Sequence, residues 1–425
     1  MKFKILICIT AITLFAALAV RVRLAAQEQN QDLPRYTVTD LGTLGGTYSL
    51  AGGLSNSGWV EGYSTLPSGN THAVLWWNGV IINLGTLGGP NSDAGYRPSN
   101  SGDAGGGSEN GVVDPYAENF CGYGTDYICL PFFWSNSLHM MIPLPTLGGN
   151  NGWAAGLNNH DMAVGVAENT TRDPTCTAPQ VFSYPPVVWD RGRVHELPMP
   201  PGDTSGFAYA INDEGQATGV TSNCSFSTPG HGLLWQNGRW INLGSLGGTF
   251  TEGVDINNLG QVAGASYLSD NAPYHYHAFL WQRGRMTDLG TLSGDYGSSG
   301  DGVNNQGQVV GGSWPNQSPW PEGVVIESAV IWQNGVITDL NTLIPPNSPL
   351  YLIEACGTIN DQGQIAGIAL QTSTGQMHAF LLTPTKERWA LSERPRVVLP
   401  DSVRKQLQQR RRFRGPIGSG VMRLK

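Results

Sequence analysis

The main part of the sequence lacks lysine and is poor in positive charge. Between Tyr36 and Thr385 there are 7 Arg, no Lys and 27 Asp plus Glu, a net charge of −20. From Lys386 to Lys425 there are 12 Lys plus Arg and 3 acidic residues, a net charge of +9. The overall charge of −8 therefore hides two segments of opposite sign. Because nucleic-acid binding depends on Lys and Arg contacts to phosphates, the acidic segment argues against nucleic acid as a partner.

Motifs for catalysis and metal binding are also absent. The sequence has no Gly-x-Ser-x-Gly elbow, no His-Glu-x-x-His and no phosphate-binding loop. It has no Asp-x-Asp-x-Asp spacing of the kind found in calcium loops. We therefore expect no cofactor and no metal. A pair of carboxylates from separate loops could still meet, as glycosidic chemistry requires.

The N-terminus has the composition of a secretory signal. Lys2 and Lys4 precede Ile5 to Val20, a stretch of mostly apolar residues, and small residues follow it. A membrane anchor is the alternative, but a span usually needs about 20 apolar residues. We predict a signal peptide over 1–26 and a linker over 27–35, and hence a secreted, extracellular or cell-envelope protein.

Glycine is abundant and belongs to a repeated turn. Gly makes up 57 of 425 residues, about twice its usual share of roughly 7 %. A four-residue turn recurs seven times, and each copy is followed four residues later by a glycine. The second residue of the turn is always Asn or Asp: Asn56, Asn100, Asn159, Asp213, Asn258, Asn305 and Asp361. Such a side chain can bond to the backbone two residues on, which stabilises a turn. The seven copies predict seven structural units, in which these residues are structural.

One copy, His231 to Ser266, displays the order of the predicted strands. An apolar run ending at Trp235 and a strand at Arg239–Leu243 flank an Asn-Gly turn that favours a hairpin. A glycine-rich connection leads to strands around Gly253–Ile256 and Gln261–Ser266, which the recurring turn joins. Four short strands per unit at this period are typical of a β-propeller.

The two ends of the chain indicate how the ring closes. The first unit begins at Tyr36 without a preceding apolar strand, and His378–Pro384 supplies one after the seventh unit. Pairing these two segments removes exposed sheet edges. We predict an all-β fold, a seven-bladed β-propeller over 36–385, closed by pairing the C-terminal strand, about 378–384, with the N-terminal unit. A β-solenoid is the alternative. In the basic tail, 386–425, Asp401-Ser402 could cap a short helix.

Three segments carry a family resemblance: His277-Ala-Phe-Leu-Trp281, Asp288-Leu-Gly-Thr-Leu292 and Val303–Ser313. In this order they resemble the bacterial extracellular HAF repeat family, named for His-Ala-Phe. The resemblance covers about residues 36–384. Copies such as His72-Ala-Val and Pro185-Pro-Val depart from the pattern. The resemblance implies secretion and a repeat fold, and no catalytic residues are carried over from it.

Function is expected where the units differ. Connections of unequal length share one face of the predicted ring, and binding usually lies on variable loops held by a rigid scaffold. The three long connections are 109–129, 168–184 and 314–327. Aromatic rings beside carboxylates suit stacking on a sugar or peptide; alternatively, they pack the loops onto neighbouring blades. The candidate ligand-binding residues are Tyr116, Tyr123, Tyr127, Asp126, Trp314 and Trp320.

Cysteine and histidine are expected to have structural roles. Five cysteines remain after the signal, and export permits disulfides. We predict the pairs Cys121–Cys129 and Cys176–Cys224, although other pairings among these four are open, and a buried thiol at Cys356. Four histidines occupy one equivalent position in their units: His72, His231, His277 and His378. Around a ring they would lie too far apart to share a metal ion, so we expect hydrogen-bonding roles.

These observations predict a secreted, monomeric propeller that binds an extracellular glycan or protein without catalysis. One alternative is a polysaccharide-acting propeller hydrolase or lyase. Another is a structural cell-surface protein without a specific ligand. The basic tail could attach electrostatically to an anionic cell surface or to the acidic propeller itself.

Overall fold

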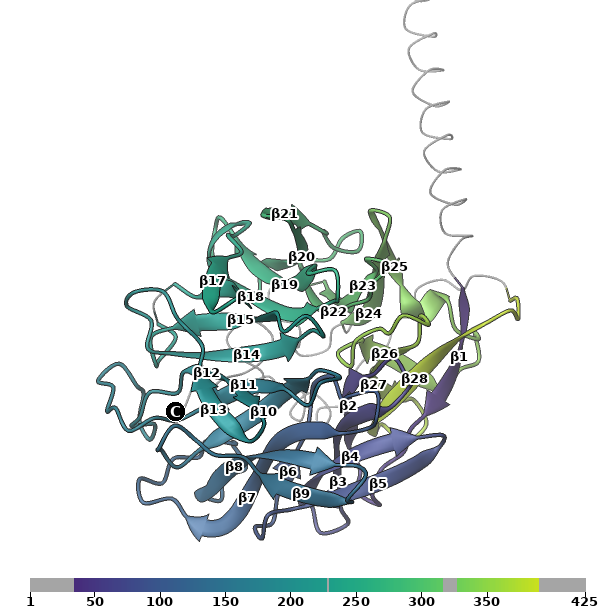
Figure 1. The fold of residues 1–425 in the computed structure, drawn as a ribbon. Coiled ribbons are helices and arrows are strands. Elements are labelled where there is room, and N and C mark those ends of the chain that lie inside the picture. Colours follow the sequence, from purple (N-terminus) through teal and green to yellow (C-terminus); the bar gives the residue numbers. More distant parts are fainter. Residues whose placement is uncertain (1–33, 228, 316–326, 390–425) are drawn as a thin grey trace, which may run out of the picture.

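The structure is a computed structural model that describes residues 34–227, 229–315 and 327–389. The predicted signal peptide, Trp320 and most of the basic tail lie outside these residues. The described part contains 28 β-strands and one short 3-10 helix, Leu340–Thr342. The strands form seven four-stranded antiparallel sheets arranged as blades around a central axis (Figure 1). The fold is therefore the predicted seven-bladed β-propeller. Within the described ranges, no helix is long and apolar enough to cross a membrane.

The strands of each blade follow one another along the chain, and the first strand lies nearest the axis. Blade 1 contains β2 (Ser49–Leu54), β3 (Val60–Thr65), β4 (Thr71–Trp77) and β5 (Val80–Gly85). Blade 2 contains β6 (Ser92–Asp93), β7 (Ala104–Val113), β8 (Tyr127–Ser135) and β9 (Met140–Pro143). Blade 3 contains β10 (Gly152–Leu157), β11 (Ala163–Ala167), β12 (Pro186–Asp190) and β13 (Arg193–Glu196). Blade 4 contains β14 (Ser205–Ile211), β15 (Ala217–Ser222), β16 (His231–Gln236) and β17 (Arg239–Asn242).

The remaining blades complete the ring. Blade 5 contains β18 (Gly247–Ile256), β19 (Val262–Leu268), β20 (Tyr276–Gln282) and β21 (Arg285–Asp288). Blade 6 contains β22 (Gly297–Val303), β23 (Val309–Trp314), β24 (Ser328–Gln333) and β25 (Val336–Asp339). Blade 7 contains β26 (Leu350–Glu354), β27 (Ile365–Gln371), β28 (Met377–Thr385) and the N-terminal strand β1 (Arg35–Asp40).

The ring closes within blade 7, where strands from the two ends of the propeller pair. β1 runs antiparallel to β28, with Arg35 opposite Thr385 and Asp40 opposite Phe380. This confirms the predicted pairing of the C-terminal strand with the N-terminal unit. Because β1 supplies the outermost strand of the last blade, the chain ends are held together by a full ladder of backbone hydrogen bonds.

The blade boundaries differ by two strands from the unit predicted from the sequence. The segment His231–Ser266 contains β16 and β17 of blade 4 followed by β18 and β19 of blade 5. The glycine-rich segment 244–248 therefore connects two blades. A cyclic repeat gives the order of the strands but not which of them lies at the axis, so the number of blades is unaffected.

The recurring turn joins the first and second strands of every blade and follows Asx-turn geometry. In blade 5, Oδ1 of Asn257 accepts hydrogen bonds from the backbone N–H groups of Leu259 and Gln261. Gly260 has a φ of 71°, a conformation that glycine adopts without steric cost. In the third copy Asp161 takes this place with a φ of 59°.

The glycine that follows each turn is required by close packing of the first two strands. A Cβ atom at this position would lie 1.9–2.1 Å from a carbonyl oxygen of the facing first strand in all seven blades. The glycines are Gly62, Gly106, Gly165, Gly219, Gly264, Gly311 and Gly367. A side chain would overlap the backbone at this distance, so only glycine fits.

The second residues of the seven turns link the blades into a closed ring of hydrogen bonds. In each link a backbone N–H donates to Oδ1 of the Asn or Asp in the next blade, over 2.8–3.1 Å. The links are Ser57–Asn100, Asn100–Asn159, Asn159–Asp213, Asp213–Asn258, Asn258–Asn305, Asn305–Asp361 and Asp361–Asn56. The same residues that count the blades therefore also fasten each blade to the next.

The hydrophobic core lies between neighbouring blades. The third strand of six blades carries a buried tryptophan: Trp76, Trp134, Trp189, Trp235, Trp281 and Trp332. Each packs against the preceding blade; Trp76, for example, contacts Ala366 and Ala379 of blade 7. Leu382 takes this place in blade 7 and packs on blade 6. Large aromatic side chains supply much of the buried area of a core, which explains why the position recurs.

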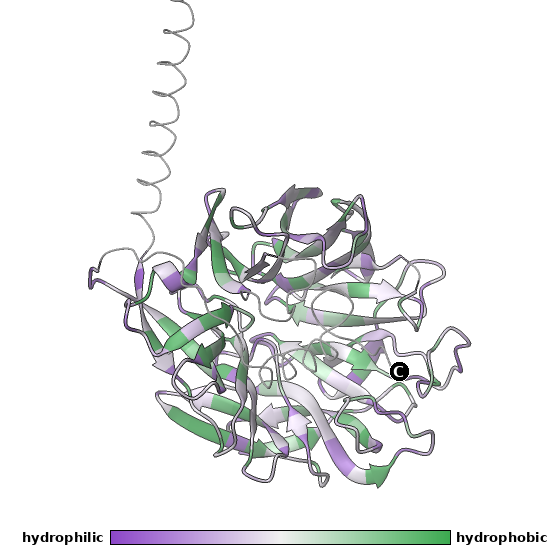
Figure 2. Cartoon of the chain, turned by 180° about the vertical axis from the view of Figure 1, so that it is seen from behind, coloured by the Kyte–Doolittle hydropathy of each residue, from purple (hydrophilic) through white to green (hydrophobic). Residues whose placement is uncertain are grey.

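The propeller has two different faces. The recurring turns and the hairpins between third and fourth strands lie on one face, which we call the turn face. The connections from second to third strands and from blade to blade lie on the other face, which we call the loop face. Hydrophobic segments follow the strands inside the blades, and hydrophilic segments gather in the connections (Figure 2).

Candidate functional site

The loop face is strongly acidic. Within the described residues, its connections and the strand ends leading into them contain one arginine, Arg172, and 14 acidic residues. The acidic residues are Asp40, Glu109, Asp114, Glu118, Asp126, Glu168, Asp173, Glu196, Asp203, Asp270, Asp288, Asp295, Glu327 and Asp339. The hairpins of the turn face instead mix acidic residues with Arg191, Arg193, Arg239, Arg283 and Arg285. The net negative charge of the propeller is therefore concentrated on the loop face.

The predicted loops 109–129 and 168–184 are joined by a buried cluster of carboxylates, which we call the acidic cluster: Asp114, Glu118 and Glu168 around Asn151. Nδ2 of Asn151 lies 3.1 Å from Asp114, 3.3 Å from Glu118 and 3.1 Å from Glu168. Glu118 also accepts a hydrogen bond of 2.6 Å from the backbone N–H of Val181. One carboxylate of the first loop therefore holds the backbone of the second loop.

The electrostatics of the acidic cluster favour protonated carboxyl groups. Burial, followed by the charges of Glu168 and Asp114, raises the pKa of Glu118 to about 8, while N–H groups of Val181 and Phe182 oppose the shift. Burial likewise raises the pKa of Glu168, against hydrogen bonds from Gln180 and Asn151. Two neighbouring carboxylates cannot both ionise without cost in a dry site. The cluster is therefore a pH-sensitive contact between the two loops.

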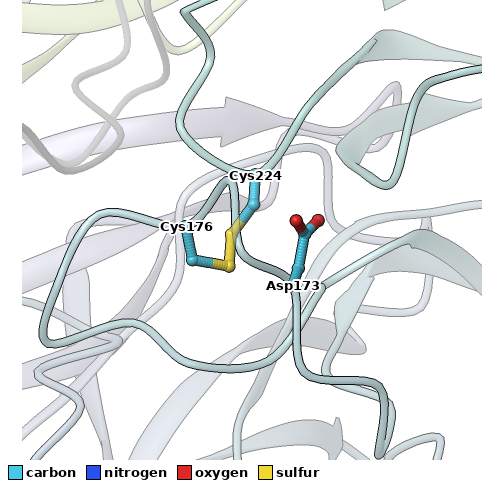
Figure 3. A group of neighbouring side chains, drawn as sticks. All are labelled: Asp173, Cys176 and Cys224. Carbon is cyan, nitrogen blue, oxygen red and sulfur yellow. A yellow bond between two sulfur atoms is a disulfide. The ribbon is translucent and has the colours of Figure 1, made fainter.

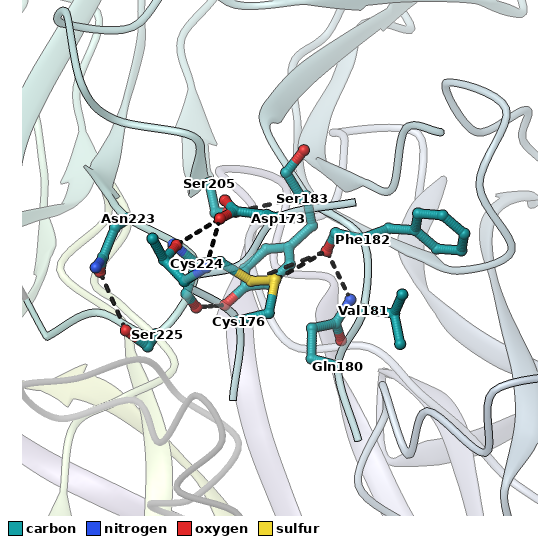
Figure 4. Close-up of a disulfide and its surroundings, with 12 residues drawn as sticks. Asp173, Cys176, Gln180, Val181, Phe182, Ser183, Ser205, Asn223, Cys224 and Ser225 are labelled. Atoms are coloured by element: carbon teal, nitrogen blue, oxygen red, sulfur yellow. Dashed lines mark hydrogen bonds between the residues drawn. A yellow bond between two sulfur atoms is a disulfide. The ribbon is translucent and has the colours of Figure 1, made fainter. Parts of the chain in front are cut away.

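Two disulfides cross-link the same loops and confirm the predicted pairing. Cys121–Cys129 closes the loop of blade 2, and Cys176–Cys224 joins the loop of blade 3 to blade 4. Figure 4 displays the second bond between the backbone of Phe182 and the segment around Asn223. Cys356 is buried as predicted, with Sγ 3.5 Å from the carbonyl oxygen of Ala51. Both disulfides of the described residues thus restrain loops of the loop face.

Asp173 lies beside the second disulfide, with its carboxylate close to both sulfur atoms (Figure 3). Its Oδ1 accepts hydrogen bonds from the backbone N–H and the hydroxyl of Thr175. A cysteine ligates metal as a thiolate. Because these sulfurs are bonded to each other, the group of Asp173, Cys176 and Cys224 does not form a metal site in the oxidised protein.

Tyr116 packs across the boundary between the two loops. It is 38 % exposed, and its ring meets that of Phe182 edge to face at 5.1 Å. The guanidinium of Arg172, the one arginine of this face, lies 5.0 Å from the centre of the Tyr116 ring. The residue therefore helps to join the loops and still presents a ring edge to solvent.

Tyr123 contacts a second group of residues, around Asp93, that the sequence did not reveal. Its hydroxyl bonds to Asp93, which also accepts a 2.6 Å hydrogen bond from Nε1 of Trp153. Burial raises the pKa of Asp93 to about 6; Glu109 adds to the shift, and the bonds from Trp153 and Tyr123 oppose it. Tyr96 packs edge to face on Trp153 at 5.6 Å. A carboxyl group that titrates near neutral pH thus lies among partly exposed aromatic rings.

The other predicted residues differ widely in exposure. Asp126 is exposed, and Tyr127 is partly exposed at the start of β8. Trp314 is fully buried, packs at 4.9 Å from Tyr276 and donates from Nε1 to the carbonyl oxygen of Tyr274. It has no surface on which a ligand could stack. Trp320 lies outside the residues that the structure describes.

The four repeated histidines form hydrogen bonds within the sheets rather than a shared site. Nδ1 of each lies 2.8–2.9 Å from a carboxylate or amide oxygen, in the pairs His72–Asn83, His231–Asp203, His277–Asp288 and His378–Asp40. Burial alone would raise the pKa of Asp288, but the bonds from His277 and Gly290 outweigh it and lower the pKa. The histidines thus have the hydrogen-bonding role that we expected.

The central axis is blocked near the turn face. Arg97 of blade 2 reaches across the ring, where its Nη2 lies 2.9 Å from Asp255 of blade 5. Asp255 also accepts hydrogen bonds from the backbone N–H of Val303 and the hydroxyl of Thr358. The recurring turns and Arg97 line a pocket of about 20 Å³ at this level, room for about one water molecule. The Arg97–Asp255 ion pair therefore crosses the axis beside the recurring turns.

The residues that sequence reasoning missed are departures from the repeat. Arg97, Asp255 and Thr358 occupy one equivalent position, two residues before the recurring turn. The other four blades have Gly or Ala there, at Gly53, Gly156, Ala210 and Gly302. An alignment of the seven units would have revealed three polar residues at a position where the other four units have Gly or Ala. Asp93 and Trp153 begin first strands, where the units vary most.

Comparison with known proteins identifies neither a family nor an activity. No family model matches the chain, and no curated protein matches it. The β-propeller domain of the Trilobed protease from Pyrococcus furiosus is 10 % identical with a TM-score of 0.44, over 67 % of this chain and 79 % of that one. Oligogalacturonate lyase in complex with manganese is 10 % identical with a TM-score of 0.44, over 82 % and 93 %.

A third similar structure is the Pyrococcus horikoshii acylaminoacyl peptidase, 12 % identical with a TM-score of 0.45 over 76 % of this chain and 49 % of that one. The chain thus spans about half the length of this peptidase. Likeness at this level carries no inference about activity. Fold and site together define a seven-bladed propeller with an ion pair across its axis and an acidic, cross-linked loop face.

Proposed function

We propose that this chain is a secreted, monomeric propeller that binds an extracellular ligand, a glycan or a protein, at its loop face without catalysing a reaction. The observation that carries the proposal is the asymmetry of the faces. The turn face repeats one arrangement seven times, whereas the loop face combines unique loops, carboxylates and aromatic rings on a cross-linked scaffold. The two disulfides support secretion, because such bonds persist in oxidising environments.

The charge of the loop face restricts the class of ligand. Fourteen carboxylic residues, opposed by a single arginine among the described residues, repel polyanions such as uronate chains. Cationic and neutral ligands meet no such barrier, and partly exposed rings such as Tyr116 and Tyr127 offer flat apolar area for stacking. We therefore expect amino-sugar polymers, neutral glycans or basic peptides to bind in preference to acidic polysaccharides.

A polysaccharide hydrolase or lyase is the second candidate, and the Asp93 carboxyl favours it. A general acid or base works best with a pKa near the operating pH, and that of Asp93 is about 6. Its neighbour Glu109 would be the second carboxyl. Against this candidate, both Glu109 oxygens accept hydrogen bonds, from Asn91 and Thr125. Glycoside hydrolysis requires two carboxyl groups that flank the glycosidic bond to be cleaved.

The test uses the full chain on an array of neutral, cationic and anionic glycans and on basic peptides. We expect binding to neutral or cationic members, and a loss of about tenfold, or 1.4 kcal/mol, in Asp126→Asn or Tyr127→Ala. Asp190→Asn on the turn face is the matched control and should bind as the parent does. Release of shortened glycans that Asp93→Asn abolishes would support the enzyme. If no probe is bound or cleaved, the result would support a structural protein without a specific ligand.

A further inference from the structure

We propose that the acidic loop face is a docking surface for the basic tail of this same chain, residues 386–425. The structure describes only Lys386 to Trp389 of this segment. The proposal concerns which surface the tail binds, and it does not depend on whether the loop face also binds an external ligand.

The first argument is charge complementarity. The propeller from Tyr36 to Thr385 has a net charge of −20, and the tail has +9. The tail contains Lys386, Arg388, Arg394, Arg396, Arg404, Lys405, Arg410, Arg411, Arg412, Arg414, Arg423 and Lys425. One exposed ion pair contributes only about 0–1 kcal/mol, so a stable contact needs many. A tether helps, because it supplies an effective concentration in the millimolar range.

The second argument is the difference between the two faces. Exposed carboxylates lie around the rim of the loop face, at Asp40, Asp126, Glu196, Asp270 and Asp288, whereas the described connections of this face contain one arginine, Arg172. On the turn face the hairpins bring arginines close to carboxylates, as where partly exposed Asp190 lies 3.8 Å from Arg191. A polycation is attracted by the sum of nearby charges. The loop face therefore attracts the tail, and the turn face offers it little net gain.

The third argument is reach. β28 ends at Thr385 on the turn face, so the tail begins on the face opposite to its proposed surface. The distance between the two faces is about the length of one strand. A six-residue strand such as β1 spans about 20 Å. Forty residues have a root-mean-square span of about 35 Å as a coil and a contour length of about 130 Å. The tail is long enough to pass around the rim of the propeller.

The experiment exploits the absence of lysine from the propeller. After residue 35 the only lysines are Lys386, Lys405 and Lys425, so all three lie in the tail. A carbodiimide joins a lysine amine to a carboxyl group as an amide, and takes up the water lost in that condensation as a urea. Treating the dilute, full-length protein with carbodiimide and mapping the products by mass spectrometry therefore reports where the tail lies.

We expect Lys405 and Lys425 to join loop-face carboxylates such as Asp126, Glu196 and Asp270. These products should exceed those with the turn-face carboxylates Asp161 and Glu214, which are exposed, and Asp190, which is partly exposed, by about fivefold or more. Raising the salt from about 0.01 M to about 1 M shortens the screening length from about 30 Å to about 3 Å and should abolish the difference. Lys386, which is exposed and directly follows the end of β28 on the turn face, is the internal control for reagent activity.

Two charge variants complete the test. The combined loop-face variant Asp126→Asn, Glu196→Gln, Asp270→Asn should reduce Lys405 and Lys425 products at the remaining loop-face sites. The turn-face variant Asp161→Asn, Asp190→Asn, Glu214→Gln removes the same charge from the other face and should leave the amounts of these products unchanged. Equal products on both faces, products only between molecules, or no Lys405 and Lys425 products while Lys386 reacts would each overturn the proposal. None of these results bears on the glycan and peptide array.

Discussion

The turn face and the loop face are built from the same seven blades by different means. On the turn face, seven nearly identical turns pass hydrogen bonds from blade to blade until the ring closes. The loop face repeats one histidine pair in four blades. Its other contacts differ from blade to blade: two disulfides, the acidic cluster and a few aromatic pairs. These unrepeated contacts fix particular loops, whereas the repeated turns fasten every blade to the next.

The largest effect should come from the repeated glycines that support the turn face. In Gly219→Ala the new Cβ would lie 1.9 Å from the carbonyl oxygen of Phe207. Relief requires separating β14 from β15, so we expect a loss of more than about 4 kcal/mol in the free energy of unfolding. Thermal unfolding measured by circular dichroism checks this. Near-parental stability would mean that the strands separate easily and that the glycine is not required by packing.

Removing a loop-face cross-link should cost less and should not disturb the ring. The chain-entropy model gives about 4 kcal/mol for Cys176–Cys224 and about 2.5 kcal/mol for Cys121–Cys129, because the bonds close segments of 48 and 8 residues. Cys176→Ser with Cys224→Ser should therefore lower the unfolding temperature more than Cys121→Ser with Cys129→Ser. Both proteins should retain the spectrum of the folded propeller. The reverse order would show that native packing, not chain entropy, decides the effect.

What the sequence could predict follows the same division between faces. The seven blades, the closing strand and both disulfides were predictable, because repetition and spacing are visible along one chain. The Arg97–Asp255 contact was not, because it joins blades on opposite sides of the ring. The burial of Trp314 depends on Tyr276 in the neighbouring blade, which no periodicity reveals. Asn151 attracts no notice in the sequence, yet three carboxylates of two loops meet at its amide.

A third prediction concerns pH, which should affect the stability of the loop face but not that of the turn face. Glu118 has an ordinary pKa of 4.5, which the fold raises to about 8. A carboxyl with a raised pKa binds more protons when folded, so its contribution to stability is complete below about pH 4.5 and is lost as the pH rises through about 8. The free energy of unfolding should therefore fall across this interval. Hydrogen exchange should reveal increasing mobility in 109–129 and 168–184, with the turn face unchanged.

The variant Glu118→Gln isolates this contribution. Its amide keeps an oxygen to accept from Val181 and cannot ionise, so the pH dependence between about 4.5 and 8 should flatten. Asp126→Asn, at an exposed position in the same loop, is the control and should keep the parental slope. An unchanged slope in Glu118→Gln would assign the pH dependence to other groups, of which Glu168 is the nearest.

The smallest effect tests the repeated turn at its one imperfect copy. Asp161 adopts a φ of 59°, where the other six turns have glycine. A side chain in the left-handed region costs roughly 1–2 kcal/mol, and somewhat less for Asp. Asp161→Gly removes this cost, although the added freedom of glycine in the unfolded chain offsets part of the gain. We expect a net stabilisation of about 0.5 kcal/mol, measured by chemical denaturation with Asp190→Gly as a turn-face control that should destabilise. If Asp161→Gly also destabilises, the carboxylate itself contributes to the third turn, and the turn face is less uniform than its sequence repeat.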